Sequence, residues 1–426
     1  MPIKMLTLDD LELEGKRVFL RVDINTPIDH ETGKLLEKAR LEEAAVTIRD
    51  LPKSRVVVAS HQGRVGRSDY TSLEAHSKAL EEFVGKPVQF VPDVFGPEAM
   101  SEIDSLSDGS VLVLDNLRFT AEENQEYKPA DAEKTFLVRR MREHVDVCVL
   151  DAFSTAHRAS PTIVGFAGLV PTCAGRNVGK ELRMLDRMSS VEKGPYVTVL
   201  GGTKVNDRLE AIDALVANNR ADNVLLCGVV GLVFLRAAGK LRGELGLEGE
   251  QRLVIKARQL LDADPERFAL PADIGIKVDR GRKDVDPTDL TAKASMLDIG
   301  PKTVERYSRL IKGAGTVFMS GPPGAFELDE FGSGTENLLR AMASSLGTTI
   351  ISGGQLSSAA RKYGVQEQID HVSTAGSALV QYLAGKRLPM IDALERAADK
   401  WGPRREVPDV WSSVVTLGEG FGTPER

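Results

Sequence analysis

Short, almost wholly apolar runs alternate with longer amphipathic segments along this chain of 426 residues. Strands buried on both faces of a parallel sheet have such runs, because helices cover both of their faces. The runs form two series, at residues 17–22, 55–60, 87–91, 110–114 and 145–150, then at 196–200, 223–227, 273–278, 316–319 and 348–351. Helical patterns occupy residues 41–51, 72–83, 130–142, 207–218, 301–311, 335–344 and 377–383. This alternation predicts an α/β fold with right-handed crossovers.

The two series are separated by a stretch that predicts a linker. It begins with Pro171 and Gly175 and continues as a helical pattern to about residue 190. We therefore expect two Rossmann-like lobes with parallel sheets, joined by a long helix. The expected boundaries are residues 1–174 for the first domain, 175–190 for the linker helix, 191–400 for the second domain and 401–426 for a C-terminal tail.

Composition excludes several classes of protein. Lys and Arg number 55 and Asp and Glu 62, so the formal net charge of −7 argues against a basic nucleic-acid binder or a polybasic membrane anchor. No apolar run reaches the roughly 18 residues of a membrane span. Residues 1–10 lack the apolar segment of a secretion signal, so we expect a cytoplasmic protein. The cysteines, Cys148, Cys173 and Cys227, show no metal-binding spacing, and we expect buried, inert thiols.

Cationic and amide side chains follow the strands of the first series. Ligands of open parallel sheets bind beyond the carboxyl ends of the strands. The residues found there are Asp23, Asn25, Arg40, His61, Arg64, Asn116, Arg118, Asp151, His157 and Arg158. Singly, each arginine is better explained by a surface salt bridge. Together they predict one site for a small phosphorylated anion, because guanidinium groups pair with phosphate and carboxylate in a bidentate manner.

Glycines follow the strands of the second series instead. The residues are Gly201, Gly202, Gly228, Gly321, Pro322, Gly353 and Gly354. Each glycine pair alone is typical of a tight turn, but three such ends before helices favour phosphate binding. No Walker motif is present, and Lys204 follows the first pair of glycines. Ser373 and Thr374 precede a helix and suit either an N-cap or an anion site.

This asymmetry between the halves predicts phosphoryl transfer. An anionic acceptor would lie on the cationic half and a nucleotide on the glycine-rich half. Such a reaction requires chiefly positioning and charge neutralisation, and closure of the two halves would exclude water.

Eight segments resemble the phosphoglycerate kinase family. They are RVFLRVDINTP at 17–27, SHQGR at 60–64, DNLRF at 115–119, DAFSTAHR at 151–158, LGGTKVND at 200–207, LDIGPKT at 297–303, GPPGAFE at 321–327 and HVST at 371–374. The resemblance runs from about residue 8 to residue 394, and its details are similar to the archaeal branch.

The resemblance implies reversible phosphoryl transfer between ATP and the carboxylate of 3-phosphoglycerate, giving 1,3-bisphosphoglycerate and ADP. The residues implied to hold the acid are Asp23, Asn25, Arg40, His61, Arg64, Arg118 and Arg158. Those implied for the nucleotide are Gly201, Gly202, Lys204, Gly228, Gly321, Pro322, Glu327, Gly353, Gly354, Gln355, Ser373 and Thr374. Arg40, Lys204 and Arg208 would be catalytic. The family implies a monomer, Mg²⁺ carried with ATP or ADP, and no nucleic-acid or membrane partner.

Departures from the family pattern fall on the nucleotide side. Gln355 occupies the position of the usual metal-binding Asp, so no residue is assigned to the metal, and Arg208 replaces a Lys. Two alternatives therefore stay open: a catalytically weakened binding or regulatory protein of this fold, and a kinase for a related carboxylate. The preference between ATP and GTP also stays open.

Overall fold

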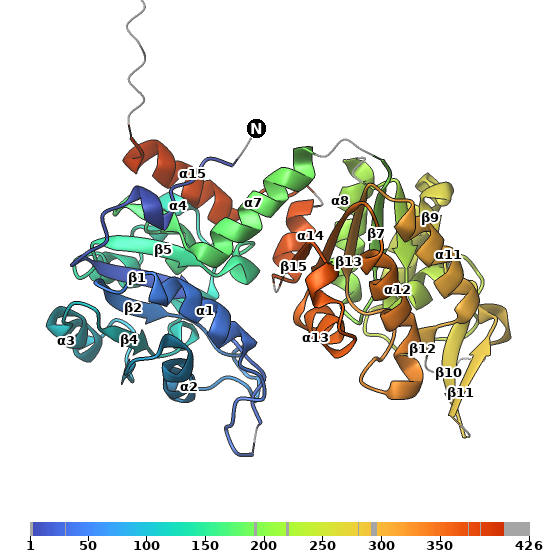
Figure 1. Ribbon diagram of the computed structural model, residues 1–426, viewed down its shortest axis with the longest axis horizontal. Helices are drawn as coiled ribbons and strands as arrows, with labels where there is room; N and C mark the ends of the chain where they lie inside the picture. Colours follow the sequence, from blue (N-terminus) through green and yellow to red (C-terminus); the bar gives the residue numbers. More distant parts are fainter. Residues whose placement is uncertain are drawn as a thin grey trace, which may run out of the picture.

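The computed structural model describes residues 3–29, 31–190, 194–218, 221–279, 281–290, 296–373, 375–383 and 385–403, with only the backbone for residues 186–190. Figure 1 shows two lobes joined by the helix α7 (Arg176–Ser190). Each lobe contains a six-stranded sheet. The predicted α/β class, with two parallel sheets and a long joining helix, is confirmed. No helix in these ranges is both long and apolar enough to span a bilayer.

The first sheet has the strand order β3-β4-β2-β1-β5-β6, and all neighbouring strands are parallel. Its strands are β1 (Arg17–Val22), β2 (Arg55–Ala59), β3 (Gln89–Val91), β4 (Val111–Leu114), β5 (Val147–Asp151) and β6 (Thr172–Ala174). Its helices are α1 (Ala39–Arg49), α2 (Glu74–Val84), α3 (Pro97–Ser105), α4 (Pro129–Ala132), α5 (Phe136–Met141) and α6 (Pro161–Val164). Side chains alternate across the sheet: Val18 and Leu20 pack in the core formed with α1 and α2, whereas Phe19 packs in the core formed with α3, α5 and α6.

The second sheet has the order β15-β14-β13-β7-β8-β9 and is likewise parallel. Its strands are β7 (Tyr196–Leu200), β8 (Asn223–Leu226), β9 (Phe268–Ala269), β13 (Thr316–Ser320), β14 (Thr348–Ser352) and β15 (His371–Ser373). Its helices are α8 (Val205–Ala217), α9 (Gly228–Ala237), α10 (Glu250–Ala263), α11 (Pro301–Lys312), α12 (Ser333–Ala343), α13 (Gly354–Lys362) and α14 (Ser377–Leu383). Leu200 and Phe318 face the core shared with α8, α10 and α14, and Val199 and Met319 face α11, α12 and α13.

One predicted strand belongs to a different sheet. The run at residues 273–278 was expected in the second parallel series, but β10 (Ile274–Val278) pairs antiparallel with β11 (Gly281–Val285) and β12 (Met296–Ile299). The reason is its exposure: Ile274 is buried, while the last two residues of β10 are exposed and no residue of the polar β11 is buried. An antiparallel sheet tolerates water on one face, whereas a parallel sheet is normally covered on both.

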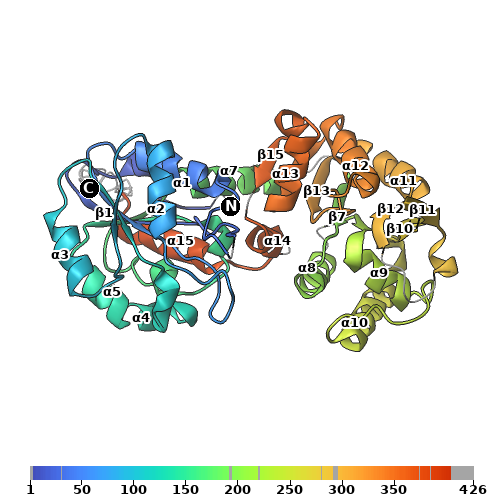
Figure 2. The ribbon, with the colours of Figure 1, turned by 90° about the horizontal axis from the view of Figure 1, so that it is seen from below.

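A second connection returns the chain to the first lobe. Helix α15 (Pro389–Trp401) lies against that lobe, as Figure 2 shows. Trp401 Nε1 donates to the carbonyl of Ala167 over 2.9 Å, and the Met390 amide donates to the carbonyl of Ala156 over 3.1 Å. The expected second domain, residues 191–400, thus includes a helix that packs on the first lobe. Residues 404–426 of the expected tail lie outside the described residues.

Candidate active site

The candidate acid site lies at the carboxyl ends of four neighbouring strands of the first sheet. Asp23 follows β1, His61 follows β2, Asn116 follows β4 and Asp151 ends β5. These strands stand in the order β4-β2-β1-β5, so the loops that follow them open at one edge.

The cationic residues predicted for this edge come together there. Burial, and after it the charges of Arg21, Arg118, Arg40 and Arg158, lower the pKa of His61 well below its ordinary value. Burial and the neighbouring charges of Arg158, Arg21 and Arg64 also lower the pKa of Arg118, to about 10. Positive charges that lower one another's pKa lie close enough to form one region of positive potential, and such a region suits a polyanionic ligand.

Arg21 is a member of this cluster that the sequence reasoning missed. It is buried, its Nη2 lies 3.2 Å from His61 Nδ1, and its Nε donates to Thr162 Oγ1 over 3.1 Å. Its Nη2 also lies 3.8 Å from Oε1 of the buried Glu123. The available signal was an arginine within the apolar run of β1, four residues after Arg17 at its start.

The other members differ in how their charge is compensated. Arg40, at the start of α1, pairs with Asp23, whose carboxylate also accepts from the Ser154 hydroxyl. Arg118 donates to the carbonyl of Gly63. Within the described residues, Arg64 and Arg158 have no ion pair and no side-chain hydrogen bond. Two of the cations are therefore available for a ligand without breaking an internal pair.

The loop that carries His61 and Arg64 is held by its own polar groups. The Gly63 amide donates to Asn25 Oδ1 over 3.0 Å, and the Gln62 amide donates to Asn116 Oδ1 over 3.2 Å. Gly63 has a φ of +64°, and a Cβ there would lie 2.3 Å from the Asp69 carbonyl oxygen. Only glycine fits this turn. Asn25 and Gly63 together therefore fix the backbone position of Arg64.

In the second lobe, the glycines predicted for the nucleotide form one packed turn. The Gly201 amide donates to the Ser320 carbonyl, and the Gly202 amide donates to the Pro322 carbonyl. A Cβ on Gly228 would lie 2.6 Å from the Gly202 nitrogen, and one on Gly321 would lie 2.2 Å from the Gly201 oxygen. The ends of β7, β8 and β13 therefore meet backbone to backbone, an approach that only glycine allows.

The N-terminus of α13 forms a second, open group. Gly353 has a φ of +107°, and its amide donates to the Ser373 carbonyl over 2.9 Å. A Cβ on Gly353 or Gly354 would have nothing within 4 Å, and Gln355 is exposed. Unpaired amides at a helix start attract phosphate. Thr374, also predicted for this site, lies outside the described residues.

The basic residues of the second lobe lie at the start of α8. Lys204 is the exposed N-cap residue of α8 and has no ion pair within the described residues. Arg208, one turn later, is buried, and its Nε and one of its Nη atoms have no hydrogen-bond partner. Burial lowers the pKa of Arg208. Glu327 is exposed, within electrostatic range of Lys362 on α13.

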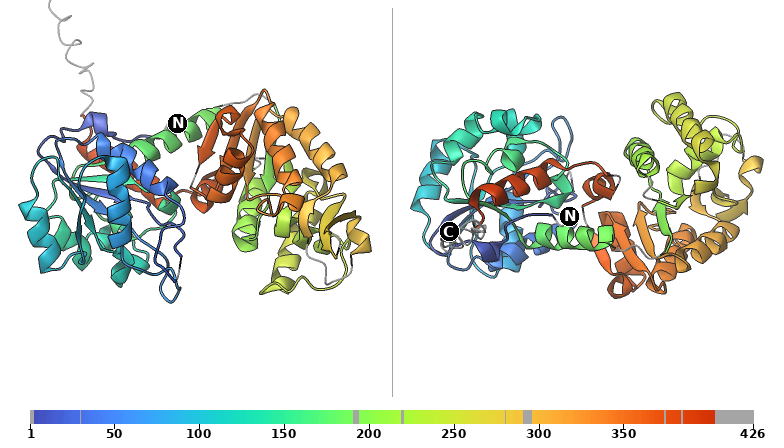
Figure 3. Two further views of the ribbon diagram at one scale, coloured as in Figure 1. Left: turned by 60° about the horizontal axis from the view of Figure 1, so that its bottom comes forward. Right: turned by 90° about the horizontal axis from the view of Figure 1, so that it is seen from above.

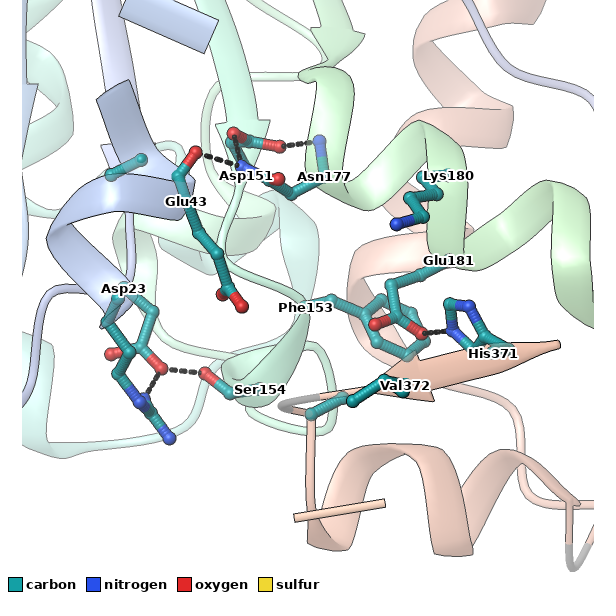
Figure 4. A pocket seen from close by; sticks show the side chains of 13 residues that line it. Asp23, Glu43, Asp151, Phe153, Ser154, Asn177, Lys180, Glu181, His371 and Val372 are labelled. Atoms are coloured by element: carbon teal, nitrogen blue, oxygen red, sulfur yellow. Dashed lines mark hydrogen bonds and ion pairs between the residues drawn. The ribbon is translucent and has the colours of Figure 1, made fainter. Parts of the chain in front are cut away.

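A cavity lies between the lobes beside α7. Figure 4 shows Asp23, Glu43 and Ser154 of the first lobe and His371 of β15 around it, with Glu181 of α7 in contact with His371. No hydrogen bond or ion pair between described residues joins the cationic cluster to the glycine turns. The structure thus assembles each predicted group within its own lobe. The two lobes approach near His157, where the charge of Asp207 on α8 opposes the burial that lowers the pKa of His157 to about 4.

The chain is similar to known proteins of one family. Residues 8–386 match the family model described as phosphoglycerate kinase. A phosphoglycerate kinase of Methanothermobacter thermautotrophicus is 40% identical over 402 residues, covering 92% of this chain and 97% of the relative. One of Sulfurisphaera tokodaii is 39% identical over 395 residues, covering 91% and 95%. The crystal structure of the Pyrococcus horikoshii phosphoglycerate kinase superposes with a TM-score of 0.86 at 35% identity, covering 93% of this chain and all of the other. The chain belongs to the phosphoglycerate kinase family.

Proposed function

We propose that the chain uses its two residue groups for phosphoryl transfer between ATP and the carboxylate of 3-phosphoglycerate, in both directions. The observation that carries this assignment is the cationic cluster in which Arg64 and Arg158 have no internal counter-charge. A doubly anionic phosphate and a carboxylate on one small molecule match such a cluster. The family makes the chain a kinase, and its use of ATP is a property of that family.

The first lobe holds the acid in this proposal. Arg64, Arg118, Arg158 and His61 hold the phosphate of the acid, and Asp23 and Asn25 orient the loops and the hydroxyl of the acid. Arg40 lies at the reacting carboxylate, where release of its pair with Asp23 would free its guanidinium for the developing charge.

The second lobe holds the nucleotide. The glycine turn of Gly201, Gly202, Gly228, Gly321 and Pro322 faces the nucleotide. The amides of Gly354 and Gln355 bind its phosphates, and Gly353, whose own amide donates to the Ser373 carbonyl, provides the turn before them. Glu327 accepts hydrogen bonds from the ribose hydroxyls. Ser373 and Thr374 complete the binding site for the nucleotide phosphates, and the role of Thr374 is proposed from the family motif alone.

In the transfer step, a carboxylate oxygen of the acid attacks the terminal phosphorus of ATP. The bond from that phosphorus to the bridging oxygen breaks, and ADP leaves with the electron pair. Lys204 and Arg208 neutralise the charge on the moving group. The orphaned Nε and Nη atoms of Arg208 support this role, since a buried guanidinium without acceptors gains most from an anionic partner. No covalent phospho-enzyme forms.

Magnesium fits this site as a partner of the phosphates. The described residues contain no group of three or more His, Cys, Asp or Glu side chains placed to hold a metal. Mg²⁺ commonly keeps several waters and binds through phosphate oxygens, and the amide oxygen of Gln355 is a further hard ligand. When bound, the metal neutralises charge on the phosphates.

The remaining expectations also stay proposals. They are a monomeric chain, a cytoplasmic location, no nucleic-acid or membrane partner, and domain limits at residues 174, 190 and 400. A coupled assay with 3-phosphoglycerate, ATP and Mg²⁺ tests the main proposal. Turnover with 3-phosphoglycerate, and none with 2-phosphoglycerate or acetate, is expected. Binding of the acid without turnover would instead indicate a regulatory protein, and turnover of another acid would indicate a related kinase.

A further inference from the structure

The first turn of the linker helix α7 is capped by side chains from two other elements. The Arg176 amide donates to Thr47 Oγ1 of α1 over 3.0 Å. The amides of Asn177 and Val178 donate to Asp151 Oδ1 of β5 over 2.9 and 3.0 Å. The first N–H groups of a helix have no partner inside it, so these three contacts satisfy donors that otherwise stay open.

The N-cap position of α7 has no side chain that could cap the helix. Gly175 precedes the helix, and a Cβ on it would lie 2.4 Å from Asp151 Cγ. Glycine therefore makes room for the carboxylate of Asp151, and the cap is supplied from outside the helix. The direction of α7 is consequently set by β5 and α1, not by its own sequence.

The same carboxylate binds α1 to α7. Asp151 Oδ2 accepts from Thr47 Oγ1 over 2.5 Å and from Asn177 Nδ2 over 2.7 Å. Asn177 Nδ2 also donates to the carbonyl of Glu43 over 2.9 Å. Figure 4 shows Asp151, Asn177 and Glu43 close together on one side of the cavity. Thr47 and Asp151 are both buried.

Helix α1 reaches from this point to the acid site. Arg40 is the second residue of α1, and Thr47 lies about two turns later on the same helix. At the far side, Asn177 and Glu181 are one turn apart on α7, and Glu181 pairs with His371 of the second lobe. A rigid helix thus connects the residue proposed to sense the acid with the residues that start the linker.

We propose that Thr47, Asp151 and Asn177, here named the hinge clamp, are positioning residues that make the angle of α7 follow the position of α1 when the acid binds at Arg40. The clamp touches neither substrate and acts through α1 and α7. This inference rests on the proposed role of Arg40. Energetic coupling of this kind is demonstrated only by its loss in variants.

Thr47→Val tests the clamp, because it removes the hydroxyl and keeps the shape. We expect kcat to fall by about 2- to 30-fold, the range of coupling losses along such contacts. The Kd of 3-phosphoglycerate alone stays unchanged, because no residue of the acid site is altered. We expect the wild-type chain to contract in small-angle X-ray scattering when 3-phosphoglycerate and a non-hydrolysable ATP analogue are added, and the contraction to be smaller in Thr47→Val. Thr47→Ser restores both readouts, since it returns the hydroxyl.

Two further variants separate coupling from stability. Asn177→Ala removes the link to the Glu43 carbonyl but leaves Asp151 bound to the helix amides, and it should reproduce the loss of kcat. Thr172→Val removes another buried hydroxyl of the same sheet, which donates to the Val170 carbonyl over 3.0 Å, and it should leave kcat and contraction unchanged.

If the wild-type chain is active, and Thr47→Val and Asn177→Ala keep its kcat and its contraction, the hinge clamp is overturned while the proposed function stands. An equal loss of kcat in Thr172→Val would also overturn it, because the effect would then follow stability. Wild-type chain without turnover would overturn the proposed function, and the clamp with it.

Discussion

Nε2 of His371 lies 2.8 Å from Oε2 of Glu181, and the contact joins β15 of the second lobe to the linker helix α7. Both side chains are largely buried, at 2% and 11% exposure. The start of α7 is itself held to the first lobe, since Arg176 pairs with Asp9 and Asp50. The pair therefore fixes an edge strand of one lobe to a helix anchored in the other.

His371→Ala should weaken this connection. It leaves the Glu181 carboxylate buried without its donor, which costs about 1–3 kcal/mol of unfolding free energy. Misplacement of the lobes should also lower kcat, by up to about 100-fold. His371→Gln supplies an amide donor, so its losses should be smaller. Urea unfolding and steady-state kinetics measure both, and equal behaviour of the two variants and the wild type would contradict the role given to this pair.

Arg64→Ala should weaken binding of the acid. Loss of one charge-assisted hydrogen bond, about 1.5–3 kcal/mol, raises the Kd of 3-phosphoglycerate roughly 10- to 100-fold. Stability should change by no more than about 0.5 kcal/mol, because Arg64 is exposed and has no internal partner among the described residues. Arg67→Ala, on the same loop and also exposed, is the control. If Arg64→Ala weakened only the binding of ATP, the assignment of the acid to the first lobe would be wrong.

Lys204→Ala should act on turnover. Removing a charge that contacts the moving phosphoryl group should lower kcat by about 10²–10³-fold, while the Kd of 3-phosphoglycerate stays unchanged. Lys312→Ala removes an exposed lysine from α11 of the same lobe and should be neutral. Single-turnover kinetics separate the transfer step from product release, and a normal rate in Lys204→Ala would refute its assignment.

Gln355→Asp should change the dependence on magnesium. A carboxylate is a stronger ligand for Mg²⁺ than an amide oxygen, so half-maximal velocity at fixed ATP should need less Mg²⁺. Gln355 is exposed at the start of α13, so the substitution should not disturb the core. Gln355→Leu, with no hard ligand, should shift the dependence the other way. Identical magnesium curves for all three proteins would place the metal elsewhere.

The buried His76 should make the protein less stable in mild acid. His76 is fully buried, and burial lowers its pKa from 6.5 to about 4. Between these values the unfolded chain binds a proton that the folded chain does not, so the unfolding free energy falls as pH decreases. The contribution of His76 is up to about 1.4 kcal/mol per pH unit.

His76→Gln should remove this contribution, and urea unfolding from pH 7 to pH 4.5 measures the slope. Asp151, whose pKa burial raises to about 6, acts in the opposite direction, because the folded chain holds its proton longer. That effect is common to both proteins and cancels in the comparison. An unchanged slope in His76→Gln would contradict the lowered pKa of His76.

Most strands of the two parallel sheets could be read from sequence, including the three-residue β3 inside the run at residues 87–91, but β6, β9 and β15 could not. The run at residues 17–22 coincides with β1, because a strand covered on both faces is largely apolar, and in β1 only Arg21 is a buried charge. The strands β6, β9 and β15 have two or three residues each, too few for any periodicity. β10 was assigned to the wrong sheet because its apolar start resembles a parallel strand, and only its partners distinguish the two.

Within the candidate site, the residues at strand ends were predictable and the contacts between elements were not. Arg64 and Arg118 stand out because they follow apolar runs. The cap of α7 by Thr47 and Asp151 joins residues more than a hundred positions apart, and no local pattern signals it. The mutual packing of Gly201 and Gly321 is likewise visible only in three dimensions.

The return of α15 to the first lobe means that the backbone passes between the lobes at two places, through α7 and through the segment before Pro389, as the view from above in Figure 3 shows. One covalent bridge alone would let the lobes swivel in every direction. A pair of bridges set apart restricts rotation to about one axis, so any relative movement of the lobes would follow a single arc.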